Sequence, residues 1–197
     1  MWRLERVLEL AGYRVINRSL ASRRLDIRSA AEDYLAPMLK ANESVAAGKI
    51  HFVTHSWGGI VVRHYLGSHL LPNLGRVVMI APPNRGSEVA DRLRESLAFR
   101  VLAGPSGQEL GTGAASVPCR LGPVSYPVGV IAGDRTFNPL FSKWIDGPND
   151  GKVSVQSTQV EGARECLVLH HGHTGLPWCR EVGDAVLCFL ATGSFAT

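Results

Sequence analysis

The stretch Ile50–His64, IHFVTHSWGGIVVRH, constrains the fold most, because two structural patterns meet within it. An apolar run over Ile50–Val53 is typical of a short buried strand, and the spacing of apolar residues from Ile60 onward predicts a helix. Ser56 stands in the turn between them, with Gly58 two residues on. A strand, a sharp turn that carries Ser, and a helix are the local context of a nucleophile elbow, in which the turn lifts the Ser hydroxyl off the sheet.

The consensus for such an elbow is Gly-x-Ser-x-Gly, and here Thr54 occupies its first position. An ordinary strand-to-helix turn would also contain Ser and Gly, because both are common turn residues, and Ser56 could then be a helix N-cap. The pentapeptide alone leaves both interpretations open, so the rest of the chain must decide between them.

Length and composition indicate one globular domain over residues 1–197. Hydrophobic residues make up 45% of the 197 residues and charged residues 19%, which is enough for a sizeable core. The net charge is +4, but the basic residues are scattered, so we expect a solvated surface and no nucleic-acid site. No apolar run reaches the roughly 18 residues of a membrane span, so we expect no stable membrane insertion.

The N-terminal segment and the cysteines favour a cytoplasmic location. The segment MWRLERVLELAGYRV lacks both the apolar core and the cleavage site of a secretory signal. The four cysteines show no CxxC spacing, and Cys166 and Cys188 stand in apolar runs, as buried inert thiols do.

The first part of the chain predicts two helices and a strand before the elbow. Helical spacing runs from Leu4 to Ala11 and ends at Gly12, and residues 13–17 are strand-like. The capping-box pattern Ser29–Glu32 opens a second helix, which Pro37 should kink or shorten.

Three further apolar runs, Arg76–Ala81, Tyr126–Gly133 and Cys166–His170, predict strands after the elbow. A final helix is expected from Pro177 to near Gly193. Strands alternating with helices indicate a three-layer α/β/α sandwich around a mostly parallel sheet of about five strands. Residues 88–121 show a mixed pattern followed by a Gly/Ser/Pro-rich stretch, where a short cap or lid insertion could sit.

The loops after these strands carry groups suited to nucleophilic catalysis. In an open parallel sheet, reactive residues collect beyond the carboxyl ends of the strands. Those loops supply, in chain order, Ser56, the carboxylates Asp134 and Asp150, and the histidines His170, His171 and His173. A Ser hydroxyl needs a His to accept its proton, and a carboxylate to orient that His.

The chain resembles α/β-hydrolases of the bacterial lipase/esterase kind over most of residues 1–193. The elbow, VVMIAPPNRGSEVADRL, GPNDGKVSV and GHTGLP carry the resemblance, and Ser, Asp and His follow in the order expected of that fold. The resemblance implies Asp150, in an Asn-Asp-Gly-x-Val segment, as the acid and His173, in a His-Thr segment, as the base. It implies a serine carboxylic-ester hydrolase that forms an acyl-enzyme on Ser56 and uses no cofactor.

Several of these residues have other interpretations. Asp150 could be a turn Asp, and Asp134 is its rival as the acid. We expect His170 to be packed or otherwise satisfied, and His55 to be structural. The histidine cluster around His171 could suggest a metal, but no acidic or Cys partner stands at ligand spacing, so we expect none.

The elbow should also supply an oxyanion donor, the backbone N–H of Trp57. In relatives, a second donor comes from a His-Gly loop that follows a strand before the first helix. Within the sheet, that strand lies between the strand at residues 13–17 and the elbow strand. Here the chain begins with a helix, so neither the strand nor the loop is present upstream of it. That strand's absence would leave either a gap or a direct pairing of the two strands. Another backbone N–H or a side chain near Met1–Arg3 or Arg18–Ser19 could replace the missing donor. We expect Trp57 and Pro83 to line the substrate pocket.

The apparent lack of that N-terminal strand and loop leaves two other functions open. One is a catalytically impaired or non-catalytic protein with the hydrolase fold, and the other is an acyltransferase or amidase that uses the same triad. The expected partner is a small-molecule or lipid-like ester, and an exposed sheet edge could support a homodimer.

Overall fold

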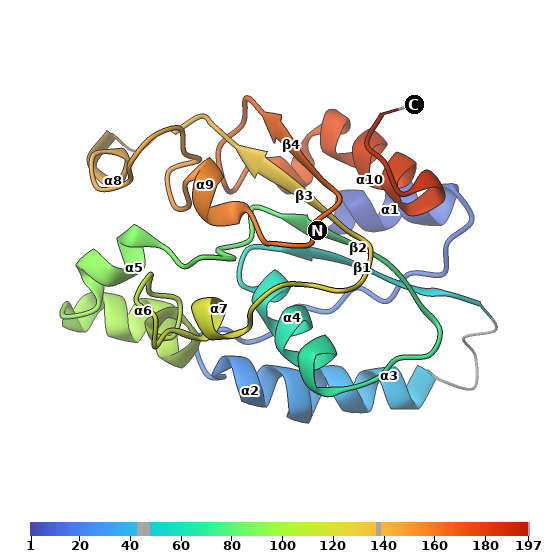
Figure 1. Ribbon diagram of the computed structural model, residues 1–197, viewed down its shortest axis with the longest axis horizontal. Helices are drawn as coiled ribbons and strands as arrows, with labels where there is room; N and C mark the ends of the chain where they lie inside the picture. Colours follow the sequence, from blue (N-terminus) through green and yellow to red (C-terminus); the bar gives the residue numbers. More distant parts are fainter. Residues whose placement is uncertain (43–47, 137–138, 197) are drawn as a thin grey trace.

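A parallel sheet of four strands forms the centre of the protein. The computed structural model describes residues 1–42, 48–136 and 139–196. The strands lie in chain order, β1 (Ile50–His55), β2 (Leu74–Ile80), β3 (Val128–Gly133) and β4 (Glu165–Leu169), each parallel to its neighbour (Figure 1). Because all four run the same way, their carboxyl ends meet at one edge of the sheet.

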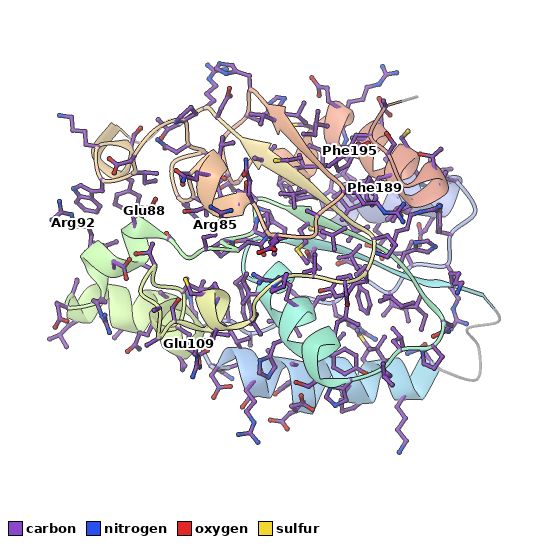
Figure 2. All side chains as sticks on the ribbon, in the orientation of Figure 1. Arg85, Glu88, Arg92, Glu109, Phe189 and Phe195 are labelled. Atoms are coloured by element: carbon purple, nitrogen blue, oxygen red, sulfur yellow. The ribbon has the colours of Figure 1, made fainter. Side chains whose placement is uncertain are left out.

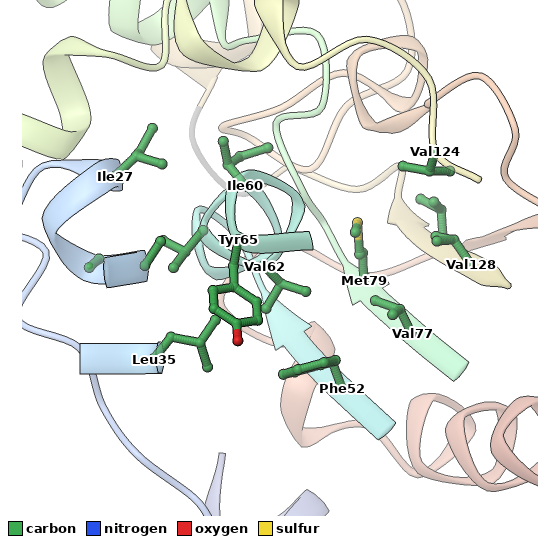
Figure 3. Close-up of a cluster of buried hydrophobic side chains, with 14 residues drawn as sticks. Ile27, Leu35, Phe52, Ile60, Val62, Tyr65, Val77, Met79, Val124 and Val128 are labelled. Carbon is green, nitrogen blue, oxygen red and sulfur yellow. The ribbon is translucent and has the colours of Figure 1, made fainter. Parts of the chain in front are cut away.

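Helices cover both faces of the sheet, as the apolar pattern of β2 requires. Val77 and Met79 pack on one side with the helical segment α2 (Ile27–Ser29), η1 (Ala30–Leu35) and α4 (Gly58–Ser68) (Figure 3). Val78 and Ile80 pack on the other with α1 (Trp2–Leu10) and α10 (Arg180–Thr192). The predicted three-layer α/β/α arrangement is therefore confirmed.

Two aromatic rings close the second face near the C-terminus. Phe189 of α10 and Phe195 lie with their ring centroids 4.8 Å apart (Figure 2). A Cβ at Gly129 of β3 would approach both rings to 2.7 Å, so only glycine lets them pack this closely on the strand.

The segment predicted as a cap holds three helices, α5 (Glu88–Leu93), α6 (Leu97–Gln108) and α7 (Val117–Arg120). Two short helices, α8 (Pro139–Ser142) and α9 (Val155–Thr158), come between β3 and β4. Figure 1 shows α5, α8 and α9 on the side of the sheet where the strands end. These insertions therefore surround the edge where the candidate site residues collect.

The predicted strand at residues 13–17 is wrong, because these residues have no regular structure. The sheet has four strands among the described residues, where about five were expected. A cavity of about 350 Å³ lies beside β1, lined by residues 13–17 together with Phe52 and Val53. The strand that the resemblance led us to expect between residues 13–17 and β1 is thus replaced by a gap, and residues 13–17 do not pair directly with β1. Strand-like residues without a partner strand form no ladder, because strand propensity depends on packing against neighbours.

The second helix starts earlier than predicted and continues past Pro37. Asp26 is its N-cap, accepting a hydrogen bond from the Ser29 backbone N–H at 2.6 Å. The turn at Ala30–Leu35 is a wide π-helix, which leads into α3 (Ala36–Asn42). A proline has no N–H to donate, and this locally widened turn just before Pro37 lets the helical path continue.

The last helix starts later than predicted. Pro177 lies in a separate 3₁₀ turn, η3 (Leu176–Trp178), and the extended Cys179 precedes α10 at Arg180. The helix ends at Gly193, whose φ of 89° suits glycine.

The described cysteines are free thiols, and the prediction that Cys166 is buried is wrong. Cys166 lies on the edge strand β4, whose residues alternate in exposure, and Cys188 is only half-buried. Among the described helices, none has the length and apolar character needed to cross a membrane.

Two leucines offer a matched test of this core. Leu176 is completely buried beside α10, whereas Leu70 is 97% exposed. We expect Leu176→Ala to lower the free energy of unfolding by about 2–5 kcal/mol, because it removes buried methyl groups and leaves a cavity. Leu70→Ala should change it by less than about 0.5 kcal/mol. Urea denaturation of both variants measures the difference, and equal losses would contradict this packing.

Candidate active site

Ser56 lies in a strained turn between β1 and α4. Its φ is 55°, a left-handed conformation that few residues other than glycine adopt. Its backbone N–H donates to the Ile80 carbonyl at 2.8 Å, and its carbonyl accepts from the Gly59 N–H at 3.0 Å. These contacts tie the turn to the neighbouring strand and to the first turn of the helix. Such strain persists only where the surroundings hold it, and it is common at functional sites.

Small residues allow the turn to be this tight. A Cβ at Gly59 would lie 3.1 Å from the Pro82 Cβ and 3.4 Å from the Thr54 Oγ1. At Gly58 the nearest atom would be the Thr54 Cβ, at 3.8 Å. Thr54 therefore fits at the position where the consensus has glycine, because its side chain faces two residues that have none.

His173 connects Ser56 to Asp150. The His173 Nε2 lies 3.0 Å from the Ser56 Oγ, and its Nδ1 lies 2.7 Å from the Asp150 Oδ2. The three residues come from the loops after β1, β3 and β4, which meet at the carboxyl edge of the sheet. A carboxylate can only accept from Nδ1–H, so the other nitrogen is free to accept the Ser56 hydroxyl proton.

The Asp150 carboxylate is completely buried and fully engaged. Its Oδ1 accepts from the backbone N–H groups of Lys152 and Val153 at 2.9 and 2.8 Å, while Oδ2 faces His173. Its backbone carbonyl accepts from the His173 N–H at 3.0 Å. The loop that carries Asp150 (the acid loop) and the loop that carries His173 (the His loop) are therefore joined by two hydrogen bonds. The turn predicted from Asn-Asp-Gly is therefore present, and the same aspartate also reaches His173.

The rival acid has a different partner. Asp134 Oδ1 lies 2.9 Å from the Nδ1 of His170, and the His170 side chain is 73% exposed. His170 is thus satisfied by a carboxylate and not packed, and this pair is separate from the one at His173.

The remaining predicted site residues lie near the elbow. Trp57 is half-buried at the N-cap of α4, and its side chain packs on the cluster that includes Ile60. Pro83 is buried in the loop after β2, whose preceding Pro82 packs at Gly59. In the N-terminal segment, the Trp2 ring meets the Trp178 ring edge-on, with the ring centroids 5.6 Å apart. Among the segments expected to supply a second oxyanion donor, Met1–Arg3 therefore lies against the turn that follows His173.

No protein-family model and no curated protein matches the chain, but solved structures do. The mature lipase BlEst2 of Bacillus licheniformis is 17% identical, with a TM-score of 0.67 over 87% of this chain and 76% of that one. A monoacylglycerol lipase of Paleococcus ferrophilus is 16% identical, with a TM-score of 0.57 over 98% and 90% of the two chains. A bromoperoxidase of Bacillus anthracis is 16% identical, with a TM-score of 0.56 over 96% and 86%. The chain has the α/β-hydrolase fold.

An α/β-hydrolase fold alone does not decide the reaction, because one fold supports many chemistries. The function of this chain must therefore rest on its own residues, including one whose contact the sequence did not predict. His55, directly before Ser56, was expected to be structural. Its Nε2 lies 3.0 Å from the His173 carbonyl oxygen, and the two rings are 4.9 Å apart. In the sequence, only the position of His55 directly before Ser56 could have indicated this contact.

Close packing over Gly133 fixes the position of the His loop. A Cβ at Gly133, the last residue of β3, would lie 2.3 Å from the His171 carbonyl oxygen and 3.0 Å from the Asp150 Cβ. The loop also hydrogen-bonds through the His171 carbonyl to the Arg135 N–H at 3.4 Å. Only glycine at this position allows the acid loop and the His loop to meet over the end of the strand.

Burial, reinforced by the nearby His173, lowers the pKa of His55 to about 4. His55 is therefore neutral near pH 7, and its Nε2–H can donate to the His173 carbonyl. Since a charged imidazole would have to be desolvated next to a second histidine, protonation favours unfolding.

Acid should thus destabilise the protein through His55. In the unfolded chain His55 takes up a proton below about pH 6.5, whereas in the folded protein it does so only near pH 4. The stability that neutral His55 contributes to the fold is therefore intact above pH 6.5 and is lost as the pH falls to 4. Between pH 7 and pH 4, the free energy of unfolding should fall by about 3 kcal/mol more in the wild type than in His55→Gln. Urea denaturation of both proteins at the two pH values measures this difference. A full wild-type loss in His55→Gln would contradict the assignment.

Proposed function

We propose that the chain is a serine carboxylic-ester hydrolase that works through an acyl-enzyme on Ser56. The observation that carries this proposal is the continuous contact from Ser56 Oγ to His173 Nε2, at 3.0 Å, and from His173 Nδ1 to Asp150, at 2.7 Å. Both distances are within hydrogen-bond reach, which a nucleophile and its base require. The names of the structural neighbours, lipases among them, support an ester as the substrate.

In the first half of the reaction, Ser56 Oγ attacks the ester carbonyl carbon while its proton passes to His173 Nε2. The Asp150 carboxylate stabilises the imidazolium and holds it in place. The negative charge on the carbonyl oxygen receives a hydrogen bond from the Trp57 backbone N–H, which lies at the start of α4, where the helix dipole also favours an anion. The C–O bond to the alcohol then breaks, and His173 returns its proton to the leaving alkoxide.

In the second half, water replaces the alcohol. His173 takes a proton from the water as its oxygen attacks the acyl carbon, and then returns the proton to Ser56 Oγ as the acid departs. The base that activates the serine therefore also activates the water, and the enzyme ends in its starting protonation state.

Ser56→Ala should abolish this chemistry. We expect hydrolysis of a p-nitrophenyl ester to fall by at least about 10³-fold, because no other group supplies the nucleophile. A fluorophosphonate probe should label the wild type at Ser56 and leave Ser56→Ala unlabelled.

The matched control is Ser68→Ala, at the exposed end of the same helix, which should keep both activity and labelling. Undiminished hydrolysis by Ser56→Ala would refute the mechanism. A folded wild type that neither hydrolyses esters nor reacts with the probe would favour the non-catalytic alternative.

Two aspartate variants test the assignment of the acid. In Asp150→Asn, Oδ1 can still accept from Lys152 and Val153, but the amide NH₂ would face His173 Nδ1 and favour the tautomer with its proton on Nε2. We expect kcat to fall by about 10³–10⁴-fold.

Asp134→Asn serves as the matched control, because Asp134 contacts only the exposed His170 among the candidate site histidines. Its steady-state kinetics should stay within a few-fold of the wild type. The reverse ranking of the two variants would assign the role of acid to Asp134.

A further inference from the structure

A second group of reactive side chains lies beside the His loop. His171, Cys179 and Glu181 each offer one potential ligand atom, and the three atoms lie within 4.8 Å of one another. The His171 Nε2 and the Glu181 Oε1 are 3.7 Å apart. The sequence led us to expect no metal at these histidines, but the fold brings Cys179, the N-cap of α10, and Glu181 of its first turn beside His171.

The backbone on each side of this group is held in place. The His171 N–H donates to the Leu169 carbonyl at 2.8 Å, and its own carbonyl packs over Gly133. On the other side, the Cys179 N–H donates to the Leu176 carbonyl at 3.2 Å, and Leu176 is completely buried. Glu181 follows in the first turn of α10. The three side chains thus project from two anchored segments.

The chemistry of these donors matches one class of ion. An imidazole nitrogen, a thiolate sulfur and a carboxylate oxygen together suit Zn²⁺ and related divalent transition metals, and disfavour Ca²⁺ and Mg²⁺. Tetrahedral Zn²⁺ with bonds of about 2.0–2.3 Å separates its ligand atoms by roughly 3.3–3.8 Å. The distance between His171 and Glu181 already falls in this range, and all three ligand atoms lie within 4.8 Å of one another, so small side-chain rotations can complete the site.

We propose that His171, Cys179 and Glu181 form a binding site for Zn²⁺ or a similar divalent transition metal, with water as the fourth ligand. Binding releases the Cys179 proton to solvent, because the thiolate is the ligand. The His171 side chain is 36% exposed and that of Glu181 63%, so an ion can enter from solvent. The ion would join the loop that carries His173 to the start of α10.

Cobalt titration tests this site directly, without any measurement of ester hydrolysis. The full chain, freed of metal by a chelator, is titrated with Co²⁺ and followed by absorption. We expect tetrahedral d–d bands and a thiolate-to-cobalt charge-transfer band, both removed by Zn²⁺, which binds more tightly than Co²⁺ at such sites. Cys179→Ser should abolish the charge-transfer band.

His171→Gln and Glu181→Gln should each weaken Co²⁺ binding by at least about tenfold. The matched controls are Cys188→Ser, a half-buried thiol farther along α10, and His170→Gln, the neighbouring exposed imidazole. Both should bind Co²⁺ like the wild type. Circular dichroism establishes that each variant is folded, and the exposed Glu181→Gln provides the test if Cys179→Ser does not fold.

The absence of a charge-transfer band in the folded wild type, or its persistence in Cys179→Ser, would overturn the proposal. Unchanged Co²⁺ affinity in both His171→Gln and Glu181→Gln would do the same. Because the readout is spectroscopic and Ser56 is not involved, Ser56→Ala should bind Co²⁺ normally. If the protein did not hydrolyse esters, the metal-binding proposal would therefore still stand or fall on the Co²⁺ titration alone. If it did not bind Co²⁺, the proposed ester hydrolysis would be unaffected.

Discussion

The buried contact between Asp150 and His173 is the interaction on which the rest of the candidate site depends. A carboxylate without solvent exposure is costly unless hydrogen bonds replace its hydration. Here two backbone N–H groups and the imidazole supply those bonds, and the Asp150 carbonyl holds the His173 backbone as well. Removing any one partner would leave a buried charge poorly compensated, so the acid loop and the His loop are stable mainly as a unit.

Ser56 meets this unit because the sheet is parallel and its turn is strained. A φ of 55° costs of order 1–3 kcal/mol for a residue with a side chain. The hydrogen bond to Ile80 and the close packing at Gly59 offset that cost. Rigid support matters for the proposed chemistry, since a nucleophile gains from being held within reach of its base before the substrate arrives.

The sequence predicted the four strands and the meeting of their loops, because buried parallel strands are continuous apolar runs with a known direction. It also singled out the three residues that the structure brings together, since chain order and loop position carry that information. The strand at residues 13–17 was wrong because its residues fit a sheet but the fold provides no partner for them. The starts of the helices at Asp26 and Arg180 were missed because they depend on local capping and turn geometry.

What no short-range pattern could predict is proximity across a reversal of the chain. His171 meets Cys179 and Glu181 only because η3 turns the backbone between them, and Leu176, inside that turn, is buried. Gly133 lies beneath the same loop, where a side chain would push both His171 and Asp150 away. The end of β3 therefore positions the proposed triad and the proposed metal ligands through one close approach. A displacement of the loop there would move His173 and His171 together, because only one residue separates them along the chain.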